Sequence, residues 1–217
     1  WKGALHRHFG ENAGEVYYAA KSFICVEVAK MVKESGIGID VCTGGELAVA
    51  LAADFPVERI ELHGNNKSLS EIEEAIKLGV SRIVVDSIQE ISRVQEIASR
   101  LGKNQKVLIR ITPGVEAHTH EAISTAHEDV KFGLSIATGA AWKAIELIEA
   151  SSNISLQGFH CHIGSQIFNT EGYEIAIKRI VELNAKFRDS FNRELSEFDI
   201  GGGFGIAYLP DETTMDP

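Results

Sequence analysis

Short apolar runs rich in valine and isoleucine recur along the chain, and longer stretches of mixed polarity separate them. The first five runs follow one another at regular intervals, and two more come at wider spacing: 16–20, 38–42, 59–62, 82–85, 106–111, 156–161 and 197–200. Near-continuous apolar runs of this length are typical of strands that are buried on both faces, as in a parallel sheet. The pattern therefore predicts seven parallel strands.

The stretches between the runs have the periodicity of helices. Apolar residues return every three or four positions between 88 and 101 and, less strictly, between 175 and 187, which predicts amphipathic helices there. Three hydroxyl residues directly after a predicted strand stand three positions before a glutamate: Thr43 with Glu46, Ser68 with Glu71 and Ser87 with Glu90. Such pairs form capping boxes that begin helices. The predicted repeat is strand, loop, helix.

A doubly wound sheet and a (β/α)₈ barrel both consist of such repeats, and the strand ends favour the barrel. A doubly wound sheet concentrates its ligand signals after the first strand or two. Here polar residues or glycines end nearly every predicted strand: Lys21, Asp40, His63, Asp86, Arg110, His162 and Gly201–Gly203. Because a barrel brings all its strand ends to one face, we predict an α/β fold, a (β/α)₈ barrel truncated before strand eight. Residues 1–217 are expected to form one barrel domain that is incomplete at both ends, with Trp1 and Pro217 as cut ends.

Composition and charge restrict the class of function. Apolar residues make up 44% of the chain and charged residues 24%, which is ordinary globular usage. The formal net charge is −10, and there is no cluster of lysines and arginines, so nucleic acid and anionic membranes are not expected as partners. A small-molecule substrate is the better expectation.

The cysteines and the apolar segments bear on location. Cys25, Cys42 and Cys161 form no CxxC pair and are odd in number, which argues against a disulfide framework or a zinc ribbon and for a reducing compartment. The chain contains no apolar stretch long enough to span a membrane and no signal-peptide pattern at its beginning. The sequence therefore predicts a cytoplasmic protein.

Lys21, which ends the first predicted strand, is the first candidate for chemistry. A lysine among apolar residues in a barrel mouth would be desolvated, and desolvation lowers the pKa of the amine, as formation of a Schiff base requires. The alternative is a lysine whose ammonium extends from the strand end into solvent.

The second candidate is the glycine run that follows the last strand, Gly201-Gly202-Gly203-Phe204-Gly205. Without Cβ atoms, its backbone N–H groups can approach and bind a phosphate, as loops after the late strands of barrels do. Glycines also simply permit tight turns.

The segment from Gly158 to Gln166 carries His160 and His162, two positions apart on one side of a strand. One interpretation is a metal site, to which other histidines would add: His118, His120 and His127. A second is that the histidines are hydrogen-bonded inside the barrel. A third is that one imidazole packs flat on an aromatic cofactor, with Ser165 donating to the phosphate of that cofactor.

Arg110 ends an otherwise apolar strand, where a guanidinium requires an anionic or phenolate partner. A structural ion pair with Asp40 or Asp86 would also satisfy it. Taken together, an amine, a cation, imidazoles and a glycine run at successive strand ends describe an anionic, aromatic, phosphorylated aldehyde. Pyridoxal 5′-phosphate has that chemistry.

Several motifs, in order and spacing, resemble the diaminopimelate decarboxylases of bacteria, a family of fold-type III enzymes with an alanine racemase-like barrel. The resemblance covers residues 16–210, and its segments are 18–21, 40–47, 62–67, 114–120, 127–134, 160–166 and 201–205. It implies the pyridoxal phosphate-dependent decarboxylation of meso-2,6-diaminopimelate to L-lysine and CO₂, the last step of lysine biosynthesis. It also implies a homodimer for the full-length protein.

The resemblance implies a role for each matching residue. Lys21 corresponds to the lysine that holds the cofactor as an internal aldimine, and His162 to the histidine that stacks on the pyridine ring. Ser165, Gly202 and Gly203 correspond to residues that bind the phosphate. Arg110 corresponds to an arginine near the phenolic oxygen. Asp40 and His63 correspond to residues that line the pocket. No metal ligand is implied. The family's glutamate for the pyridine nitrogen, a further phosphate loop and a C-terminal β domain have no counterpart in residues 1–217.

Three other functions remain as alternatives. The first is another fold-type III decarboxylase, which acts on ornithine or arginine and shares the lysine and the glycine run. The second is a non-catalytic barrel that binds pyridoxal phosphate for cofactor homeostasis. A metal-dependent hydrolase that uses His160 and His162 is the third, although its first ligand would be expected where Lys21 stands.

Overall fold

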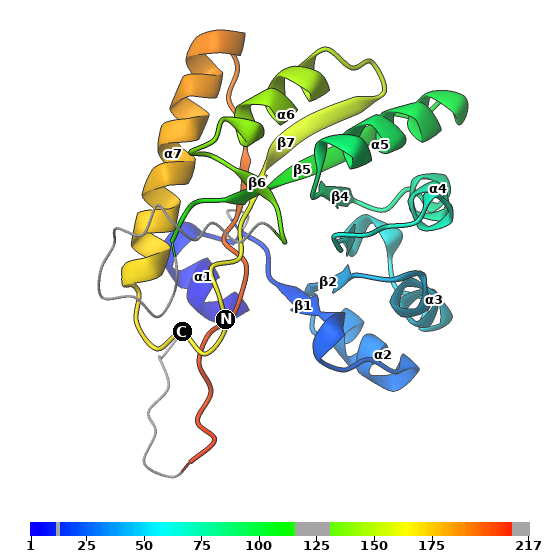
Figure 1. Cartoon of the computed structure of the whole chain (residues 1–217). Coiled ribbons are helices and arrows are strands. Elements are labelled where there is room, and N and C mark those ends of the chain that lie inside the picture. Colours follow the sequence, from blue (N-terminus) through cyan, green and yellow to red (C-terminus); the bar gives the residue numbers. More distant parts are fainter. Residues whose placement is uncertain (12–13, 116–130, 210–217) are drawn as a thin grey trace.

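The computed structural model describes residues 1–11, 14–115 and 131–209 (Figure 1). The strands are β1 (Tyr17–Ala19), β2 (Gly38–Val41), β3 (Ile60–Leu62), β4 (Arg82–Val85), β5 (Gln105–Thr112), β6 (Leu134–Ser135), β7 (Ile154–His160) and β8 (Glu197–Asp199). The α-helices are α1 (Lys2–Phe9), α2 (Val26–Glu34), α3 (Gly44–Ala52), α4 (Leu69–Leu78), α5 (Ile88–Arg100), α6 (Ala140–Glu149) and α7 (Glu171–Phe191). Two short 3₁₀ turns, Ala20–Ser22 and Val57–Arg59, complete the described elements.

All seven predicted strands are present and pair in parallel. The sheet follows the order β1-β2-β3-β4-β5-β7-β8, and β6 pairs only with the end of β5. The small strand β6 was not predicted. The predicted α/β fold with a parallel, curling sheet is confirmed, and the sheet is an incomplete barrel whose edge strands are β1 and β8.

The capping hydroxyls begin the helices at the predicted places. Ser68 and Glu71 form a full capping box at the start of α4. At α3 and α5 the hydroxyl accepts the predicted hydrogen bond, but the glutamate reaches one residue further back: Glu46 accepts from the N–H of Cys42 at 2.6 Å and Glu90 from that of Asp86 at 2.7 Å. Each glutamate thereby connects its helix to the end of the preceding strand.

The core lies between the sheet and the helices on its outer face. Helices α2 to α7 cover that face (Figure 1), and the apolar side chains between the two layers form one continuous cluster. Close packing of β7 on β8 requires Gly158, because a Cβ atom there would lie 1.7 Å from the carbonyl oxygen of Glu197.

Helix α1 bridges the two ends of the curled sheet on its open side. Lys2 at its start donates to the carbonyl oxygen of Gly36, just before β2, at 3.0 Å. Trp1 stacks on Phe204, beyond β8, with 4.1 Å between the ring centroids. The first turn of α1 therefore contacts both ends of the sheet.

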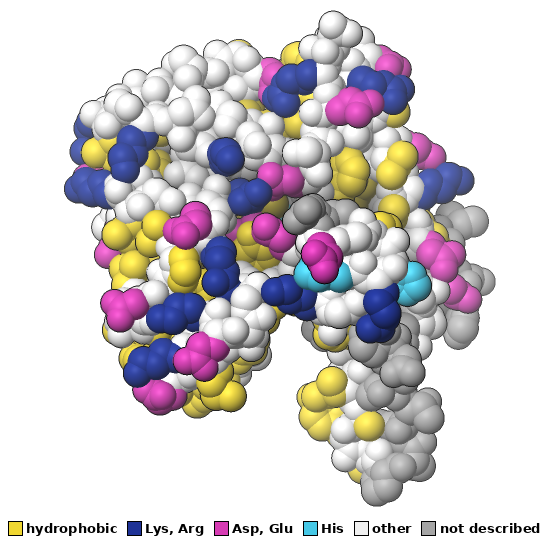
Figure 2. Space-filling view, turned by 180° about the vertical axis from the view of Figure 1, so that it is seen from behind, with side chains coloured by type: hydrophobic (Ala, Val, Ile, Leu, Met, Phe, Trp, Pro, Cys, Tyr) yellow, Lys and Arg dark blue, Asp and Glu magenta, His cyan; other side chains and the backbone are white. Residues whose placement is uncertain are grey.

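On the side shown in Figure 2, basic and acidic side chains are interspersed rather than gathered by sign. In the described part of the chain, no helix has both the length and the apolar character needed to cross a bilayer. The described cysteines are free thiols, as predicted.

Candidate functional site

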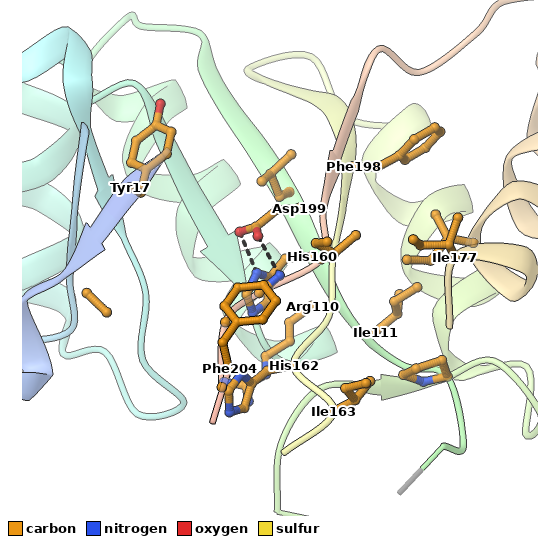
Figure 3. A pocket seen from close by; sticks show the side chains of 18 of the residues that line it. Tyr17, Arg110, Ile111, His160, His162, Ile163, Ile177, Phe198, Asp199 and Phe204 are labelled. Carbon is orange, nitrogen blue, oxygen red and sulfur yellow. Dashed lines mark hydrogen bonds and ion pairs between the residues drawn. The ribbon is translucent and has the colours of Figure 1, made fainter. Parts of the chain in front are cut away.

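A cavity of about 1900 Å³ opens at the carboxyl ends of the strands and continues into the interior of the sheet (Figure 3). Most of the predicted cofactor-binding residues line it: Lys21, Asp40, His63, Arg110, His162, Gly202 and Gly203. Ser165 is exposed and lies outside this lining. The fold thus brings together side chains from strand ends that are up to 180 positions apart in sequence, as a barrel does.

Lys21 stands in the 3₁₀ turn that follows β1. Ser22 holds this turn by donating to the carbonyl oxygen of Ala19 at 2.8 Å. The Lys21 side chain is exposed, so the expected desolvation is not met, because the turn lies beside the edge strand where the sheet is open. The ammonium nevertheless acts on the cavity, since its charge lowers the pKa of His162 and opposes the burial that raises the pKa of Cys42.

His162 lies two residues beyond the end of β7, where its imidazole stays uncharged. Burial, followed by the positive charges of Lys21 and Arg110, lowers its pKa to about 4. The ring lies beside the glycine run, since a Cβ atom on Gly203 would be 3.3 Å from its Cε1 atom. A neutral aromatic ring at this place can pack on a flat ligand, but it holds no proton to donate at neutral pH.

The glycine run has the backbone geometry of an anion-binding loop. Gly201 and Gly203 have φ angles of 73° and 99°, and Cβ atoms there would lie 2.4 Å and 2.0 Å from the carbonyl oxygens of Cys161 and Gly164. A Cβ atom on Gly202 would meet nothing within 4 Å. Within the described residues, the N–H groups of Gly202 and Gly203 have no hydrogen-bond acceptor. Two free donors at a crowded but open turn fit a phosphate group.

Arg110 lies on β5, two residues before the end of that strand. Its Nε atom is 3.7 Å from a carboxylate oxygen of Asp86, and its guanidinium lies 4.5 Å from the ring centroid of Phe132. Of the two partners considered from the sequence, Asp86 is the one in place. The distance of 3.7 Å is too long for a hydrogen bond, and the same Asp86 oxygen is buried without a hydrogen-bond partner. The N–H donors of Arg110 are therefore available for a further anion.

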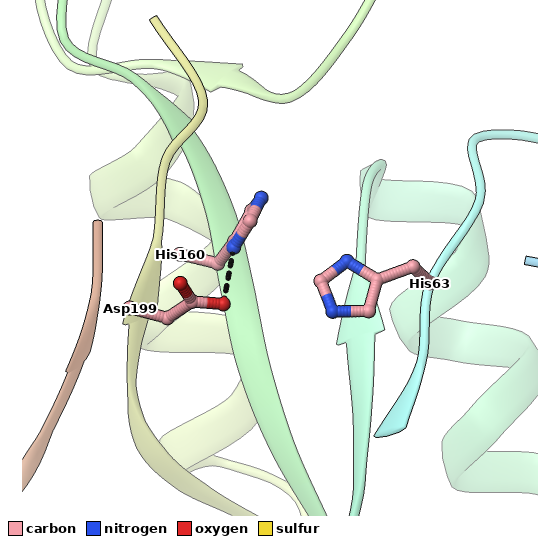
Figure 4. A group of neighbouring side chains, drawn as sticks. All are labelled: His63, His160 and Asp199. Carbon is pink, nitrogen blue, oxygen red and sulfur yellow. Dashed lines mark hydrogen bonds and ion pairs between the residues drawn. The ribbon is translucent and has the colours of Figure 1, made fainter. Parts of the chain in front are cut away.

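Below the mouth, the cavity floor is a layer of buried and half-buried polar and charged side chains. His63 lies with its Nε2 atom 3.5 Å from Asp40 and 3.6 Å from Glu61. Burial by itself lowers the pKa of His63, but the carboxylates of Asp40 and Glu61 raise it to about 10. His63 is therefore an imidazolium at neutral pH. The ring of His160 stands edge-on to it, with 4.8 Å between the centroids (Figure 4).

Two further ion pairs complete this charged floor. His160 bonds Asp199 at 2.6 Å through its Nδ1 atom. Arg82 on β4 binds Glu197 on β8 through two hydrogen bonds and lies 3.7 Å from Glu61. Because β4 and β8 are far apart in the sheet, these contacts cross its interior. Apart from His160, the sequence reasoning missed these residues, although Glu61 and Asp199 interrupt apolar runs and Arg82 and Glu197 are the first residues of theirs.

The two histidines of the His-x-His pair do different things in the structure. His160 is bonded to Asp199 in the floor, whereas His162 lies at the mouth beside the glycine run. Among the described residues, two groups of side chains lie close enough together to hold a metal ion: His63 with His160 and Asp199, and Asp40 with Glu61 and His63. Neither group contains His162. The other candidate ligands, His118, His120 and His127, lie outside the described residues.

Comparison with known proteins agrees with this site. Residues 2–216 match the family model described as the pyridoxal-dependent decarboxylase, pyridoxal binding domain. The diaminopimelate decarboxylases of Mycobacterium leprae and Bacillus subtilis are 55% and 45% identical over 94% and 93% of this chain, which covers 43% and 46% of their lengths. The chain therefore spans less than half of these curated relatives.

Solved structures show the same fold. Diaminopimelate decarboxylase from M. jannaschii in complex with L-lysine superposes with a TM-score of 0.88 at 30% identity, over 98% of this chain and 50% of that one. The Helicobacter pylori enzyme, also complexed with L-lysine, gives 0.85 at 29% identity, over 99% of this chain and 54% of that one. The chain thus belongs to the pyridoxal-binding domain family of the pyridoxal-dependent decarboxylases, whose cofactor is pyridoxal 5′-phosphate.

Proposed function

We propose that this chain forms the cofactor-holding part of a diaminopimelate decarboxylase, which converts meso-2,6-diaminopimelate into L-lysine and CO₂. The observation that carries the proposal is the joint placement of Lys21, His162 and the two free glycine N–H groups around one cavity, in a chain so similar to enzymes of that name. We also propose that the full-length protein is a cytoplasmic homodimer, as its resemblance to the family implies.

The residues present fit pyridoxal phosphate. The N–H groups of Gly202 and Gly203 suit its phosphate, and Ser165 is proposed to add a hydroxyl there. The uncharged ring of His162 suits the face of the pyridine, because a neutral ring can stack without bringing a second positive charge beside a protonated ring nitrogen. Arg110 suits the phenolic oxygen. Asp40 and His63 line the deeper side.

Pyridoxal phosphate, when bound, supplies the electron sink for the electron pair that the departing carboxylate leaves behind. Lys21 would hold the cofactor through its side-chain amine. Its exposure makes it accessible to the substrate amine, which must exchange with it. His162 orients the ring and excludes water from its face. The overall reaction balances, since the substrate loses CO₂ and gains one proton at the same carbon.

The charge pattern of the cavity favours this orientation. Lys21 and Arg110 bring positive charge to the mouth, where the cofactor phosphate and the substrate carboxylates are anionic. His162 cannot be the proton donor at neutral pH, because the same two cations and its burial keep it unprotonated. The proton that replaces CO₂ is therefore assigned to the Lys21 amine, after that amine has been released by the substrate.

The test begins with the full-length protein and its lysine. Loaded with pyridoxal phosphate, the wild type is expected to show the visible absorbance band of a lysine-bound cofactor and to release L-lysine from meso-diaminopimelate. Lys21→Ala is expected to abolish the band and to lower turnover by at least about 100-fold, the lower end of what a proton-transfer group contributes. Lys178→Ala, an exposed lysine of α7, is the matched control and should leave both unchanged.

Product analysis then distinguishes the substrates. Release of CO₂ from ornithine or arginine in preference to diaminopimelate would replace the proposed substrate by that of a related decarboxylase. A protein that shows the band but releases CO₂ from none of the three would be the non-catalytic, cofactor-holding barrel. A band that survives Lys21→Ala would remove the assignment of Lys21 itself.

A further inference from the structure

Asp199 is the one acidic side chain of the charged floor that bonds the glycine run directly. It is the last residue of β8, and its two carboxylate oxygens have separate partners. Oδ2 bonds Nδ1 of His160 at 2.6 Å, and Oδ1 accepts the N–H of Gly201 at 2.7 Å (Figure 4). A single side chain thus connects the floor to the first residue of the loop at the mouth.

The other contacts of the run leave its donors facing the cavity. The carbonyl oxygen of Gly203 accepts from the N–H of Ile167 at 2.9 Å, and that of Gly202 accepts from the hydroxyl of Tyr173 at 3.0 Å. Both carbonyls are therefore occupied, while the N–H groups of Gly202 and Gly203 are free in the described structure. With the Gly201 N–H taken by Asp199, the loop presents two donors in a fixed direction.

The arrangement also solves an electrostatic problem. An unpaired carboxylate beside an anion-binding loop would repel a phosphate dianion. His160 bonds the Asp199 carboxylate, and the imidazolium of His63 lies against the His160 ring. The positive charge of His63 offsets the negative charge of Asp199. Asp199 can therefore accept the N–H of Gly201 without repelling the phosphate.

We propose that Asp199, held by His160, is a positioning residue that presets the glycine run for the cofactor phosphate, and so determines the preference for the phosphorylated form of the cofactor. This inference rests on the proposed function. Asp199 does not touch the cofactor in this account. It acts through the backbone of Gly201.

The test compares pyridoxal phosphate with pyridoxal, which lacks the phosphate, on the cofactor-free, full-length protein. The dissociation constant of each is measured by the change in protein fluorescence, with inorganic phosphate as a competitor. Asp199→Ala is expected to weaken pyridoxal phosphate binding by about 10- to 100-fold, the range for loss of a hydrogen bond to a charged group. Binding of pyridoxal is expected to change by less than about threefold.

Two conservative variants separate positioning from general damage. Asp199→Asn keeps an oxygen for the Gly201 N–H and is expected to recover most of the preference for the phosphorylated form. His160→Gln removes the imidazole that bonds Asp199 and is expected to lose about 3- to 10-fold of that preference. Glu197→Gln, on the same strand and bonded to Arg82 but not to the glycine run, is the matched control, and it should lower stability without changing the preference.

The outcomes are decisive in each direction. Equal weakening of pyridoxal phosphate and pyridoxal by Asp199→Ala, or no weakening of either, would overturn the inference. If the alanine variant does not fold, the same reading applies to His160→Gln. A wild-type protein that binds neither compound would instead refute the proposed function, so the two failures are distinguishable.

Discussion

The cavity has two levels, the mouth and the floor, and the pKa of a histidine is shifted in opposite directions at the two levels. At the mouth, burial and the cations Lys21 and Arg110 lower the pKa of His162 to about 4. In the floor, the carboxylates of Asp40 and Glu61 overcome burial and raise the pKa of His63 to about 10. Both side chains are shielded from solvent, so burial alone does not explain the difference. The sign of the neighbouring charges decides it.

This difference assigns distinct tasks to the two levels. The mouth presents a neutral ring, free backbone donors and accessible cations, which is what an anionic aromatic ligand requires. In the floor the charged side chains lie close to one another, although one Asp40 oxygen and the Nε2 atom of His63 make no hydrogen bond among the described residues. The floor therefore holds the strands in register across the open sheet, and the mouth is left available for chemistry.

The largest expected effect comes from removing the floor cation. His63→Leu removes the cation that faces half-buried Asp40 and buried Glu61 and leaves Arg82, 3.7 Å from Glu61, as the remaining positive charge there, so we expect a loss of about 3 kcal/mol in the free energy of unfolding, the lower end of the range for a broken buried pair. Urea denaturation of the full-length protein measures it. Adding Glu61→Gln to His63→Leu should recover part of the loss, because one buried charge is then removed. A loss below about 1 kcal/mol in the single variant would show that the floor does not depend on this cation.

The next effect concerns the mouth, where two adjacent glycines should respond differently. Gly203→Ala places a Cβ atom 2.0 Å from the Gly164 carbonyl oxygen at a φ of 99°. We expect strain of about 1–3 kcal/mol and, because the loop must shift, at least about tenfold weaker binding of pyridoxal phosphate. Gly202→Ala meets no atom within 4 Å of its Cβ and should keep the fold unchanged. Equal unfolding free energies for the two variants would contradict the geometry.

The sequence was sufficient for the sheet and for most of the mouth. Strands buried on both faces must be apolar, so the runs from Val16 to Ile200 predicted the strand order and the helices between them. The polar residues at strand ends then indicated which side chains meet, since parallel strands place their ends on one face. This part of the prediction depends only on local pattern and on the geometry of the fold class.

The floor was not predicted, for a physical reason. Glu61 stands inside a strand, and Arg82 and Glu197 each begin one, but the sequence of a strand does not say whether a polar side chain meets solvent or an opposite charge across a barrel. The pairing of Arg82 with Glu197 joins residues from β4 and β8 that only the curvature of the whole sheet brings together. For Lys21 the sequence left two interpretations open, a desolvated amine and an ammonium that extends into solvent, and the exposed side chain beside the edge strand β1 agrees with the second.

A smaller effect distinguishes the two histidines by pH. His63 has a pKa near 10 when folded and 6.5 as the reference value, so its contribution to stability is complete below about pH 6.5 and is lost as the pH rises through 10. His162 has a folded pKa of about 4, so the unfolded state binds its proton more readily, and stability falls as the pH drops from 6.5 towards 4.

Unfolding free energies measured across this pH range test the assignment. In the acidic arm, His162→Phe should remove a dependence of about 1–2 kcal/mol. In the alkaline arm, the wild type should lose stability more steeply than His63→Leu. If His162→Phe flattened the alkaline arm instead, the charge states of the two levels would be reversed.

The smallest effect tests whether the helix layer outside the sheet influences either level. The Ser68 hydroxyl accepts a hydrogen bond from the N–H of Glu71, and the Glu71 carboxylate accepts one from the N–H of Ser68 and one from the N–H of Gly44 at the start of α3. Ser68→Ala removes this cap, so we expect a loss of about 1 kcal/mol in stability. Ser99→Ala, an exposed serine near the end of α5, is the control. Because the cap lies on the outer layer, the pH dependence and the preference for phosphorylated cofactor should both stay at wild-type values. A shift in either would mean that the helix starts, and not only the ion pairs, hold the strand ends in place.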